Sequence, residues 1–326
     1  MIFPKWGLHF REIWCIIRME SFGIICFSHI PKGESPVPQL PVAMEYVRIA
    51  PYTSMRVGGT VRYLYRPESE EDFASLVKTL SGGDTPFLVI GGASNVLFPD
   101  IDYPGAVILT TAVRSLRMEK GRIVASCGVS LSALASFAQE RGKSGLAFAY
   151  GIPGTVGGGV YMNAGAYGGE ISDCFEEALC VDRSGRQVTL KKDDLRFAYR
   201  HSALQENGLF LLHAVFSCPD GDPAAIRAEM DRNMTARREK QPLEFPSCGS
   251  AFKRPEGHYA GALIEQAGLK GFSVGGAQVS EKHAGFVINR GGATAADVRA
   301  LLEAVQKAVW EAHGVKLEPE IRILSF

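Results

Sequence analysis

Residues 151–169 read GIPGTVGGGVYMNAGAYGG, and eight of these nineteen positions are glycine. An even share of the chain's 36 glycines over 326 residues would place about two in a segment of this length. Glycine has no Cβ, so its backbone reaches positive φ and can lie flat against another surface. Such a segment is costly to order, and it is typical of places where backbone N–H groups approach a ligand closely, as in anion-binding nests.

The residues between these glycines are mostly apolar or aromatic. Tyr161, Tyr167 and the amide of Asn163 are interleaved with them. A solvated surface loop, which is the alternative interpretation, would carry Ser, Asp and Lys in place of Ile, Val, Met and Tyr. The segment therefore predicts a site for a large, flat, phosphorylated cofactor.

The composition is that of an ordinary globular protein, with 46% apolar and 21% charged residues. The 35 basic and 35 acidic side chains balance, so neither nucleic acid nor an anionic membrane is indicated as a partner. The seven cysteines are scattered without a C-x-x-C pair, which excludes the common zinc and dithiol redox motifs. We expect a reducing, cytoplasmic setting and no membrane span.

The first 43 residues differ from the rest of the chain. They are apolar and then rich in proline, and their longest uncharged run, residues 21–31, is too short to cross a bilayer. Arg18 and Glu20 interrupt what could be the core of a signal peptide. We expect residues 1–43 to be a non-native or disordered extension, with the chain proper starting at Met44.

Strand and helix patterns alternate from there to about residue 150. Alternating apolar residues predict strands, and Ser69, followed by three acidic residues, predicts the start of a helix. More strands are expected after the glycine-rich segment. The expected strands are 61–65, 87–90, 107–110, 123–126, 177–182, 187–190 and 209–216, and a helix is expected at 131–141.

The sequence PDGDP at 219–223 breaks this pattern and predicts a domain boundary. A helix is expected at 224–240, and its last turn carries Arg237, Arg238 and Lys240. These cations either interact with the helix dipole or form a basic site for ligand phosphates. A capping box from Thr294 to Asp297 starts a last helix that ends at Gly314, and a final strand is expected at 315–324.

Several common site motifs are missing from the chain. It has no P-loop, no strict G-x-G-x-x-G after a strand, no His/Glu cluster with metal-ligand spacing and no G-x-S-x-G. P-loop enzymes, Rossmann dehydrogenases, metal centres and serine hydrolases are therefore not indicated.

Residues 151–169, together with GGASNVL at 91–97, resemble the flavin-binding elements of the UDP-N-acetylenolpyruvoylglucosamine reductase family, which acts in peptidoglycan precursor synthesis. The resemblance runs from about residue 45 to the end of the chain, and the spacing is similar to the shorter subtype, which lacks a tyrosine-bearing insertion. Further matching motifs are 53–59 (TSMRVGG), 199–202 (YRHS), 249–255 (GSAFKRP), 268–271 (GLKG), 275–283 (GGAQVSEKH) and 317–322 (LEPEIR).

The resemblance implies an α+β fold with two domains. The first is a two-part FAD-binding domain of the PCMH/vanillyl-alcohol-oxidase type at 44–221, with parts at about 44–105 and 106–221. A smaller α+β substrate-binding domain would follow at 222–326, with its last strand returning to the FAD site. We expect a monomer or weak oligomer.

The resemblance also implies the reaction. NADPH is the electron donor, and the enolpyruvyl ether of UDP-N-acetylglucosamine is reduced through FAD to the lactyl ether of UDP-N-acetylmuramate. Hydride addition at the vinyl terminus places negative charge on the substrate carboxylate, which requires preorganised cationic or donor groups. The adjacent carbon then needs a proton donor.

Three residues align with the family's catalytic positions. Ser250 aligns with the proton donor, although by position alone it is a turn serine, and its weak acidity would require a supporting hydrogen-bond network. Arg200 aligns with the arginine that stabilises the enolate, and its guanidinium suits a carboxylate; otherwise it would be an ordinary strand-end ion pair. Glu320 aligns with a partner in proton delivery, the alternative being a solvated pair with Arg322.

Lys240 and His283 align with substrate-contacting residues of the family. Arg254 stands where some relatives carry Asn, so it would either pair with a phosphate or point to solvent. Cys248 is expected to be a small packing residue, with a thiol nucleophile as the alternative.

The predicted FAD contacts are backbone groups of both glycine-rich segments together with a few side chains. They are Arg56, Gly91, Gly92, Ala93, Ser94, Asn95, Gly151, Ile152, Pro153, Gly154, Thr155, Gly158, Asn163, Gly165 and Ala166. Two rival functions remain at this point, namely an oxidase with the same FAD domain and a non-catalytic binding module.

Overall fold

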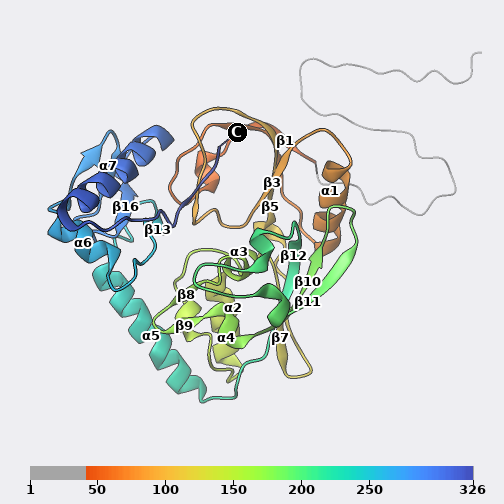
Figure 1. Cartoon of the computed structure of the whole chain (residues 1–326). Helices are drawn as coiled ribbons and strands as arrows, with labels where there is room; N and C mark the ends of the chain where they lie inside the picture. The colour runs from red at the N-terminus through yellow and green to blue at the C-terminus, as the bar shows by residue number, and fades with distance from the viewer. Residues whose placement is uncertain (1–41, 326) are drawn as a thin grey trace, which may run out of the picture. The chain divides into compact units, whose positions relative to one another are not determined.

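The computed structural model describes residues 42–325, so the expected extension at 1–43 lies almost wholly outside the described residues. A first sheet has the order β1-β2-β5-β3 (Figure 1). Strand β1 is antiparallel to β2, whereas β2 and β3 run parallel to β5. The strands are β1 (Met44–Arg48), β2 (Thr60–Tyr65), β3 (Phe87–Ile90) and β5 (Tyr103–Leu109).

Helix α1 (Glu70–Ser81) connects β2 to β3 in this sheet, and the hydroxyl of Ser69 accepts the N–H of Asp72 at its start, as the sequence predicts. The expected division at residue 105 falls inside β5, which continues as an inner strand to Leu109. The first part of the domain therefore extends a few residues further than expected.

A second sheet is wholly antiparallel and has the order β11-β10-β12-β7-β6. Helices α1, α2 and α3 contribute buried side chains to the core that it shares. The elements are β6 (Leu116–Glu119), β7 (Arg122–Ser126), α2 (Leu131–Glu140), α3 (Val156–Tyr161), α4 (Ile171–Cys174), β10 (Phe175–Val181), β11 (Gln187–Lys191) and β12 (Phe210–Phe216).

Helix α3 lies inside the glycine-rich segment, where no helix was predicted because glycine disfavours helix interiors. The hydroxyl of Thr155 caps it by accepting the N–H of Gly158, and Val156 and Val160 are fully buried. Tertiary packing of a short apolar face therefore overrides the weak local propensity.

A third sheet, in the order β13-β16-β15-β14, forms a second core with α6 (Ala260–Gln266) and α7 (Ala295–His313). Helix α7 has the predicted capping box, and Gly314 ends it with a φ of 66°. The strands are β13 (Ser247–Ser250), β14 (Ser273–Val274), β15 (Ala277–Val279) and β16 (Phe286–Asn289).

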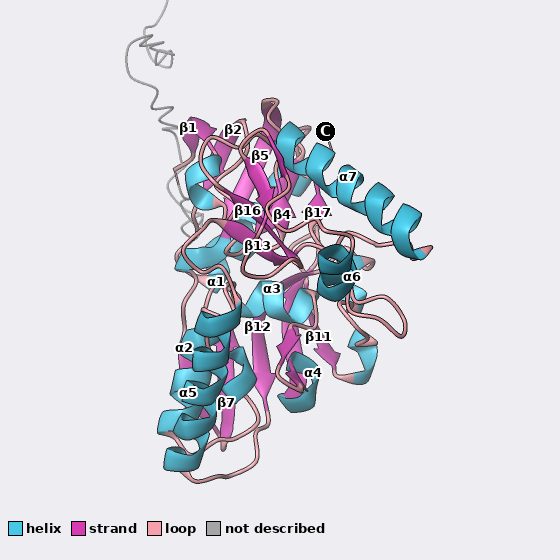
Figure 2. Ribbon diagram, turned by 90° about the vertical axis from the view of Figure 1, so that its left-hand side faces the viewer, coloured by secondary structure: helices cyan, strands magenta, loops and turns pink. Residues whose placement is uncertain are grey.

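Helix α5 (Pro223–Lys240) begins directly after the expected domain boundary at residue 222. Its side chains Ile226 and Met230 are buried in the core of the second sheet, and it lies beside α2 (Figure 2). The helix then leads to the third sheet (Figure 1). The core that buries the apolar face of α5 is therefore that of the second sheet.

The expected final strand at 315–324 is shorter in the structure. Only β17 (Arg322–Ile323) pairs with another strand, β4 (Val96–Leu97), in parallel. Pro319, which has no N–H to donate, makes a single bridge to Phe252. Leu317 and Ile321 are buried as expected, but Ile323 is exposed. Within 42–325, no helix combines the length and apolar character that a membrane crossing requires.

Candidate active site

The two predicted cofactor segments, 91–95 and 151–155, lie directly against each other. A Cβ on Gly91 would collide with Oγ1 of Thr155, and one on Gly92 would come within 3.4 Å of Cα of Gly154. Gly154 itself has a φ of 134°, which L side chains rarely adopt. The glycines are thus required for two backbones to approach closely, which is the geometry of a cradle lined by main-chain groups.

Arg237 lies beside this cradle with an unsatisfied guanidinium. Arg237 is 6% exposed, and a Cβ on Gly151 would lie 3.3 Å from Nε of Arg237. Nη1 donates to Oε1 of Gln241 at 3.1 Å, but Nε and Nη2 find no hydrogen-bond partner among residues 42–325. Burial lowers the pKa of Arg237. Because buried charges are normally paired, these donors indicate an anionic or carbonyl oxygen from a ligand. A flavin nucleotide offers both kinds of oxygen, so the residues present fit this cofactor.

Asn163, predicted as a cofactor contact, uses its side chain for the protein instead. It is fully buried, Nδ2 donates to the carbonyl of Ala198 at 3.2 Å, and Oδ1 accepts the N–H of Ser172 at 3.0 Å. A φ of 43° and these two bonds make it a support for the glycine-rich loop. The sequence places a polar residue there but does not show which way it points.

Two further predicted cofactor residues also bind other parts of the chain. The amide of Asn95 donates to the carbonyl of Glu320 at 3.1 Å, and the carbonyl of Gly165 accepts from Nη2 of Arg200 at 3.3 Å. These bonds connect the two glycine-rich segments to the catalytic candidates Glu320 and Arg200. Arg56 is exposed. Contact of FAD with Arg56 and with the remaining predicted residues of the two glycine-rich segments stays a prediction.

A cavity of about 550 Å³ brings together six predicted residues that are widely separated in sequence. Its walls include all three catalytic candidates and all three substrate-binding candidates. They are Arg200, Lys240, Ser250, Arg254, His283 and Glu320.

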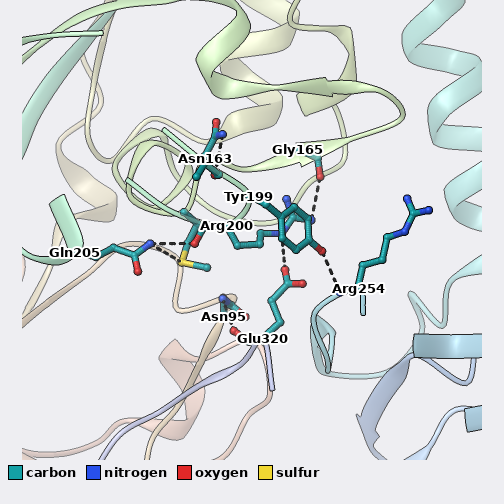
Figure 3. A network of polar contacts seen from close by, with 10 residues as sticks. Asn95, Asn163, Gly165, Tyr199, Arg200, Gln205, Arg254 and Glu320 are labelled. Carbon is teal, nitrogen blue, oxygen red and sulfur yellow. Dashed lines mark hydrogen bonds and ion pairs between the residues drawn. The ribbon is translucent and has the colours of Figure 1, made fainter. Parts of the chain in front are cut away.

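Arg200 and Glu320 form an ion pair at this cavity (Figure 3), with Nε and Oε1 2.7 Å apart. Both side chains are largely buried. Burial raises the pKa of Glu320 more than the neighbouring Arg200 guanidinium lowers it. The expected alternative, a solvated pair of Glu320 with Arg322, is wrong.

Ser250 ends β13 after Gly249, whose φ is 75°, at an irregularity in the pairing of β13 with β16. The kink leaves Ser250 exposed at the cavity. Its hydroxyl has no hydrogen-bond partner among the described residues, so the supporting network expected for a serine acid is not formed by the chain alone. The N–H of Glu320 donates to the carbonyl of Ala251 at 2.9 Å, which joins the two catalytic segments.

Three substrate candidates lie around the same opening. Nδ1 of His283 accepts the N–H of Gly285 at 3.1 Å, so in the neutral ring Nε2 carries the proton. Burial lowers the pKa of His283, which keeps the ring neutral. The guanidinium of Arg254 lies 4.1 Å from the ring centroid of Tyr259, and its backbone N–H donates to Oη of Tyr199 at 3.2 Å. Arg254 is thus held by an aromatic ring, and Lys240 is exposed at the end of α5.

Cys248 is a packing residue, as expected. It is buried, and burial raises the pKa of its thiol to about 12. A thiol in that state is not the nucleophile that the alternative interpretation requires.

Gln205 is a polar residue near the site that the sequence patterns did not indicate, and Arg237 is one that they indicated only as part of a basic helix end, as one of two alternatives. The basic last turn of α5 was a signal for Arg237, although it did not show which cation is buried. Gln205 carries no sequence signal, because a lone glutamine at the end of a short 3₁₀ helix is unremarkable. Its hydrogen bonds join the segments of Tyr161, Arg200 and Arg322, and Figure 3 shows the one to Arg200.

Comparisons with known proteins agree with this geometry. A family profile described as FAD binding domain matches residues 61–191, and one described as UDP-N-acetylenolpyruvoylglucosamine reductase, C-terminal domain, matches residues 241–324. The second profile starts where α5 ends.

Complete relatives are similar over most of their length. A UDP-N-acetylenolpyruvoylglucosamine reductase of Latilactobacillus sakei is 45% identical over 85% of this chain and 91% of its own. One of Caldicellulosiruptor bescii is 47% identical over 84% of this chain and 88% of its own. The crystal structure of UDP-N-acetylenolpyruvylglucosamine reductase from Thermus caldophilus superposes with a TM-score of 0.75 at 31% identity, covering 86% of this chain and 98% of that one.

Proposed function

The chain belongs to the UDP-N-acetylenolpyruvoylglucosamine reductase family, and from this premise we propose that the cavity around Arg200, Ser250 and Glu320 is where its substrate is reduced. The enzyme is a flavin-dependent oxidoreductase of peptidoglycan precursor synthesis. It reduces UDP-N-acetylglucosamine enolpyruvate to UDP-N-acetylmuramate with NADPH as electron donor. The observation that carries the site assignment is the convergence of six predicted residues on one cavity.

FAD binds along the cradle formed by residues 91–95 and 151–155 in this proposal. When bound, it supplies the hydride chemistry, accepting two electrons from NADPH and returning them to the substrate. The cradle offers backbone groups at close range, and Arg237 offers two buried donors without a protein acceptor. These features support a ligand with oxygen acceptors on both a phosphate and a ring.

Arg200 holds the substrate carboxylate. Hydride addition to the vinyl carbon pushes negative charge onto that carboxylate, and a fixed, partly buried guanidinium stabilises it without reorganising. The ion pair with Glu320 keeps the guanidinium in place before the substrate arrives. The interaction between Arg200 and the substrate carboxylate is stronger in the transition state than in the ground state, because the additional negative charge develops only there.

Ser250 donates the proton to the adjacent carbon. Its hydroxyl is exposed to the cavity and is not already committed to a protein acceptor. Glu320, whose pKa is raised by burial, lies on the segment hydrogen-bonded to Ala251 and supports this transfer.

Lys240, Arg254 and His283 bind the UDP-sugar. Two of them are cations on the cavity wall, which suits a pyrophosphate. The neutral His283 ring presents an Nε2 donor. We assign FAD binding to two parts, 44–109 and 110–240, and substrate binding to 241–325, in a cytoplasmic monomer or weak oligomer.

An anaerobic two-step titration tests the proposal. The flavin absorbance of the purified protein is bleached with NADPH, and UDP-N-acetylglucosamine enolpyruvate is then added. We expect immediate reoxidation with formation of UDP-N-acetylmuramate, whereas UDP-N-acetylglucosamine, which lacks the vinyl group, leaves the flavin reduced. Reoxidation by dioxygen alone would favour the rival oxidase and overturn the substrate assignment.

A further inference from the structure

Gln205 lies outside the cavity wall but is hydrogen-bonded to both sequence segments that carry the Arg200–Glu320 pair, and Figure 3 shows its contact with Arg200. It ends the 3₁₀ helix Ala203–Gln205 and is partly buried. Nε2 donates to the carbonyl of Arg200 at 3.1 Å and to the carbonyl of Tyr161 at 2.9 Å. Oε1 accepts from Nη1 of Arg322 at 3.0 Å.

These two bonds can use both N–H donors of the amide nitrogen, which also lies 3.9 Å from Sδ of Met162. A carboxamide has two N–H donors and one acceptor oxygen, and here two carbonyls and a guanidinium face them. A carboxylate of the same shape has no hydrogen to donate, so it would place an oxygen against two carbonyl oxygens. The site therefore requires glutamine rather than glutamate, even though a cation lies on its other side.

The contact with Arg200 fixes an unfavourable backbone. Arg200 has a φ of 56°, in the left-handed region that residues with a Cβ seldom occupy. Such a conformation persists only where surrounding contacts hold it. The bond from Gln205 to the Arg200 carbonyl is a contact of this kind, and the direction of the guanidinium follows from the backbone that it stabilises.

The contact with Arg322 fixes the other partner. Arg322 is two residues beyond Glu320, and its guanidinium lies 5.1 Å from the ring centroid of Tyr161. Gln205 thus binds the carbonyl of Tyr161 and the side chain that lies over the Tyr161 ring. From the opposite side, Asn95 holds the carbonyl of Glu320. The segment that carries Glu320 is therefore held at the Glu320 carbonyl and at the Arg322 side chain.

We propose that Gln205 is a positioning residue that sets the relative placement of Arg200 and Glu320 by binding the Arg200 carbonyl and the Arg322 side chain at the same time. It lies outside the cavity wall and acts through the Arg200–Glu320 pair, which an Arg200 substitution removes. The expected effect on reoxidation rests on the proposed function. The expected effect on the Arg200–Glu320 distance does not depend on the proposed function.

The kinetic test compares two variants with one matched control. Gln205→Met keeps the length and removes the polar atoms, and Gln205→Glu keeps the acceptor for Arg322 and removes both donors. The control is Gln306→Glu on α7. In wild type the side-chain amide of Gln306 donates to the carbonyl of Leu317 at 2.8 Å, and neither residue lines the cavity. Each half-reaction is followed by anaerobic stopped flow with FAD occupancy measured by absorbance.

We expect both Gln205 variants to slow reoxidation by the enolpyruvyl substrate about 10- to 100-fold, as a misplaced catalytic group does. Flavin reduction by NADPH and FAD occupancy should stay within about 3-fold of wild type, and Gln306→Glu should change neither half-reaction. Equal slowing of both half-reactions, or reoxidation within about 2-fold of wild type, would overturn the inference.

A double-variant cycle separates positioning from general packing. In an Arg200→Met background, the proposal predicts that Gln205→Met slows reoxidation by less than about 2-fold more, because the group through which it acts is gone. Fully multiplicative effects would show that Gln205 works independently of Arg200 and would contradict the proposal.

The structural test does not depend on the substrate. Crystal structures of wild type and Gln205→Met should differ in the distance between Nε of Arg200 and Oε1 of Glu320. We expect 2.7 Å in wild type and more than about 3.5 Å in the variant, with the sheets unchanged. An intact pair in the variant would overturn the inference whatever the reaction. A wild-type enzyme that fails to reoxidise while the variant pair opens would instead overturn the proposed function alone.

Discussion

Nε of Arg200 and Oε1 of Glu320 lie 2.7 Å apart although 120 positions separate the two residues in the sequence. Arg200 lies between β11 and β12 of the second sheet, and Glu320 lies near the C-terminal end of the chain. The C-terminal segment reaches Arg200 because β17 pairs with β4, which directly follows the first cofactor segment. The same pairing that completes the fold therefore delivers the carboxylate to the cavity.

Removal of the proposed proton donor should affect one half-reaction only. We expect Ser250→Ala to slow reoxidation by the enolpyruvyl substrate about 100- to 10,000-fold, the usual contribution of a positioned acid, with normal flavin reduction by NADPH. Anaerobic stopped flow measures both rates. Ser247→Ala, at the other end of β13, is the control and should resemble wild type. Unchanged turnover of Ser250→Ala would show that the proton comes from elsewhere.

Asp100 joins the first part of the FAD domain to helix α7. Its Oδ1 and Oδ2 accept the N–H groups of Ala295 and Ala296 at 2.8 and 3.0 Å, at the helix N-terminus. Removing a cap of this kind costs about 1 kcal/mol, and the lost charge adds to it. We expect Asp100→Ala to lower the free energy of unfolding by about 1–2 kcal/mol in urea titrations. Asp100→Asn, which keeps an acceptor oxygen but loses the charge, should lose less, and an Asp100→Asn variant as stable as wild type would argue against the charge contribution.

The regular elements were predictable because local signals agreed with burial. Ser69 caps α1 and Thr294 opens α7 as their side chains suggest, and the alternating strands 61–65 and 187–190 are found in the sheets. Helix α3 and the irregular segment before β17 were not predictable, because tertiary contacts decide them. A glycine-rich helix needs a buried face, and the last segment owes its path to Phe252 and β4.

The site was predictable as a set of residues but not as a set of contacts. Motifs brought Arg200, Ser250 and Glu320 forward, and the cavity contains all three. Motifs could not reveal that Asn163 faces the protein, or that Gln205 binds the Arg200 carbonyl. These properties depend on side-chain direction, which follows from neighbours that are distant in sequence.

Glu320 should leave a pH signature in stability. Burial raises its pKa above the ordinary 4.5, so the folded state binds the proton more tightly than the unfolded state. Its contribution is therefore complete below about pH 4.5 and declines as the pH rises through the raised native value. We expect the unfolding free energy of wild type to fall relative to that of the non-titrating Glu320→Gln over this range. Parallel urea-derived stability curves from about pH 4 to 7 would contradict the raised pKa.

Removal of the Arg237 guanidinium should have opposite effects on cofactor binding and on the stability of the apoprotein. In the chain alone its buried guanidinium has two donors without a protein acceptor, which is unfavourable, and a bound flavin nucleotide would satisfy them. We expect Arg237→Met to weaken FAD binding about 10- to 100-fold, the range for a charged hydrogen bond, and to leave the apoprotein as stable as wild type or more stable. Exposed Arg238→Met is the matched control and should alter neither. Flavin fluorescence titration gives the affinity, and urea unfolding of flavin-free protein gives the stability. A variant that binds FAD normally would place the partner of these donors elsewhere, whereas an apoprotein destabilised by several kcal/mol would mean that the guanidinium already has its partner in the folded chain.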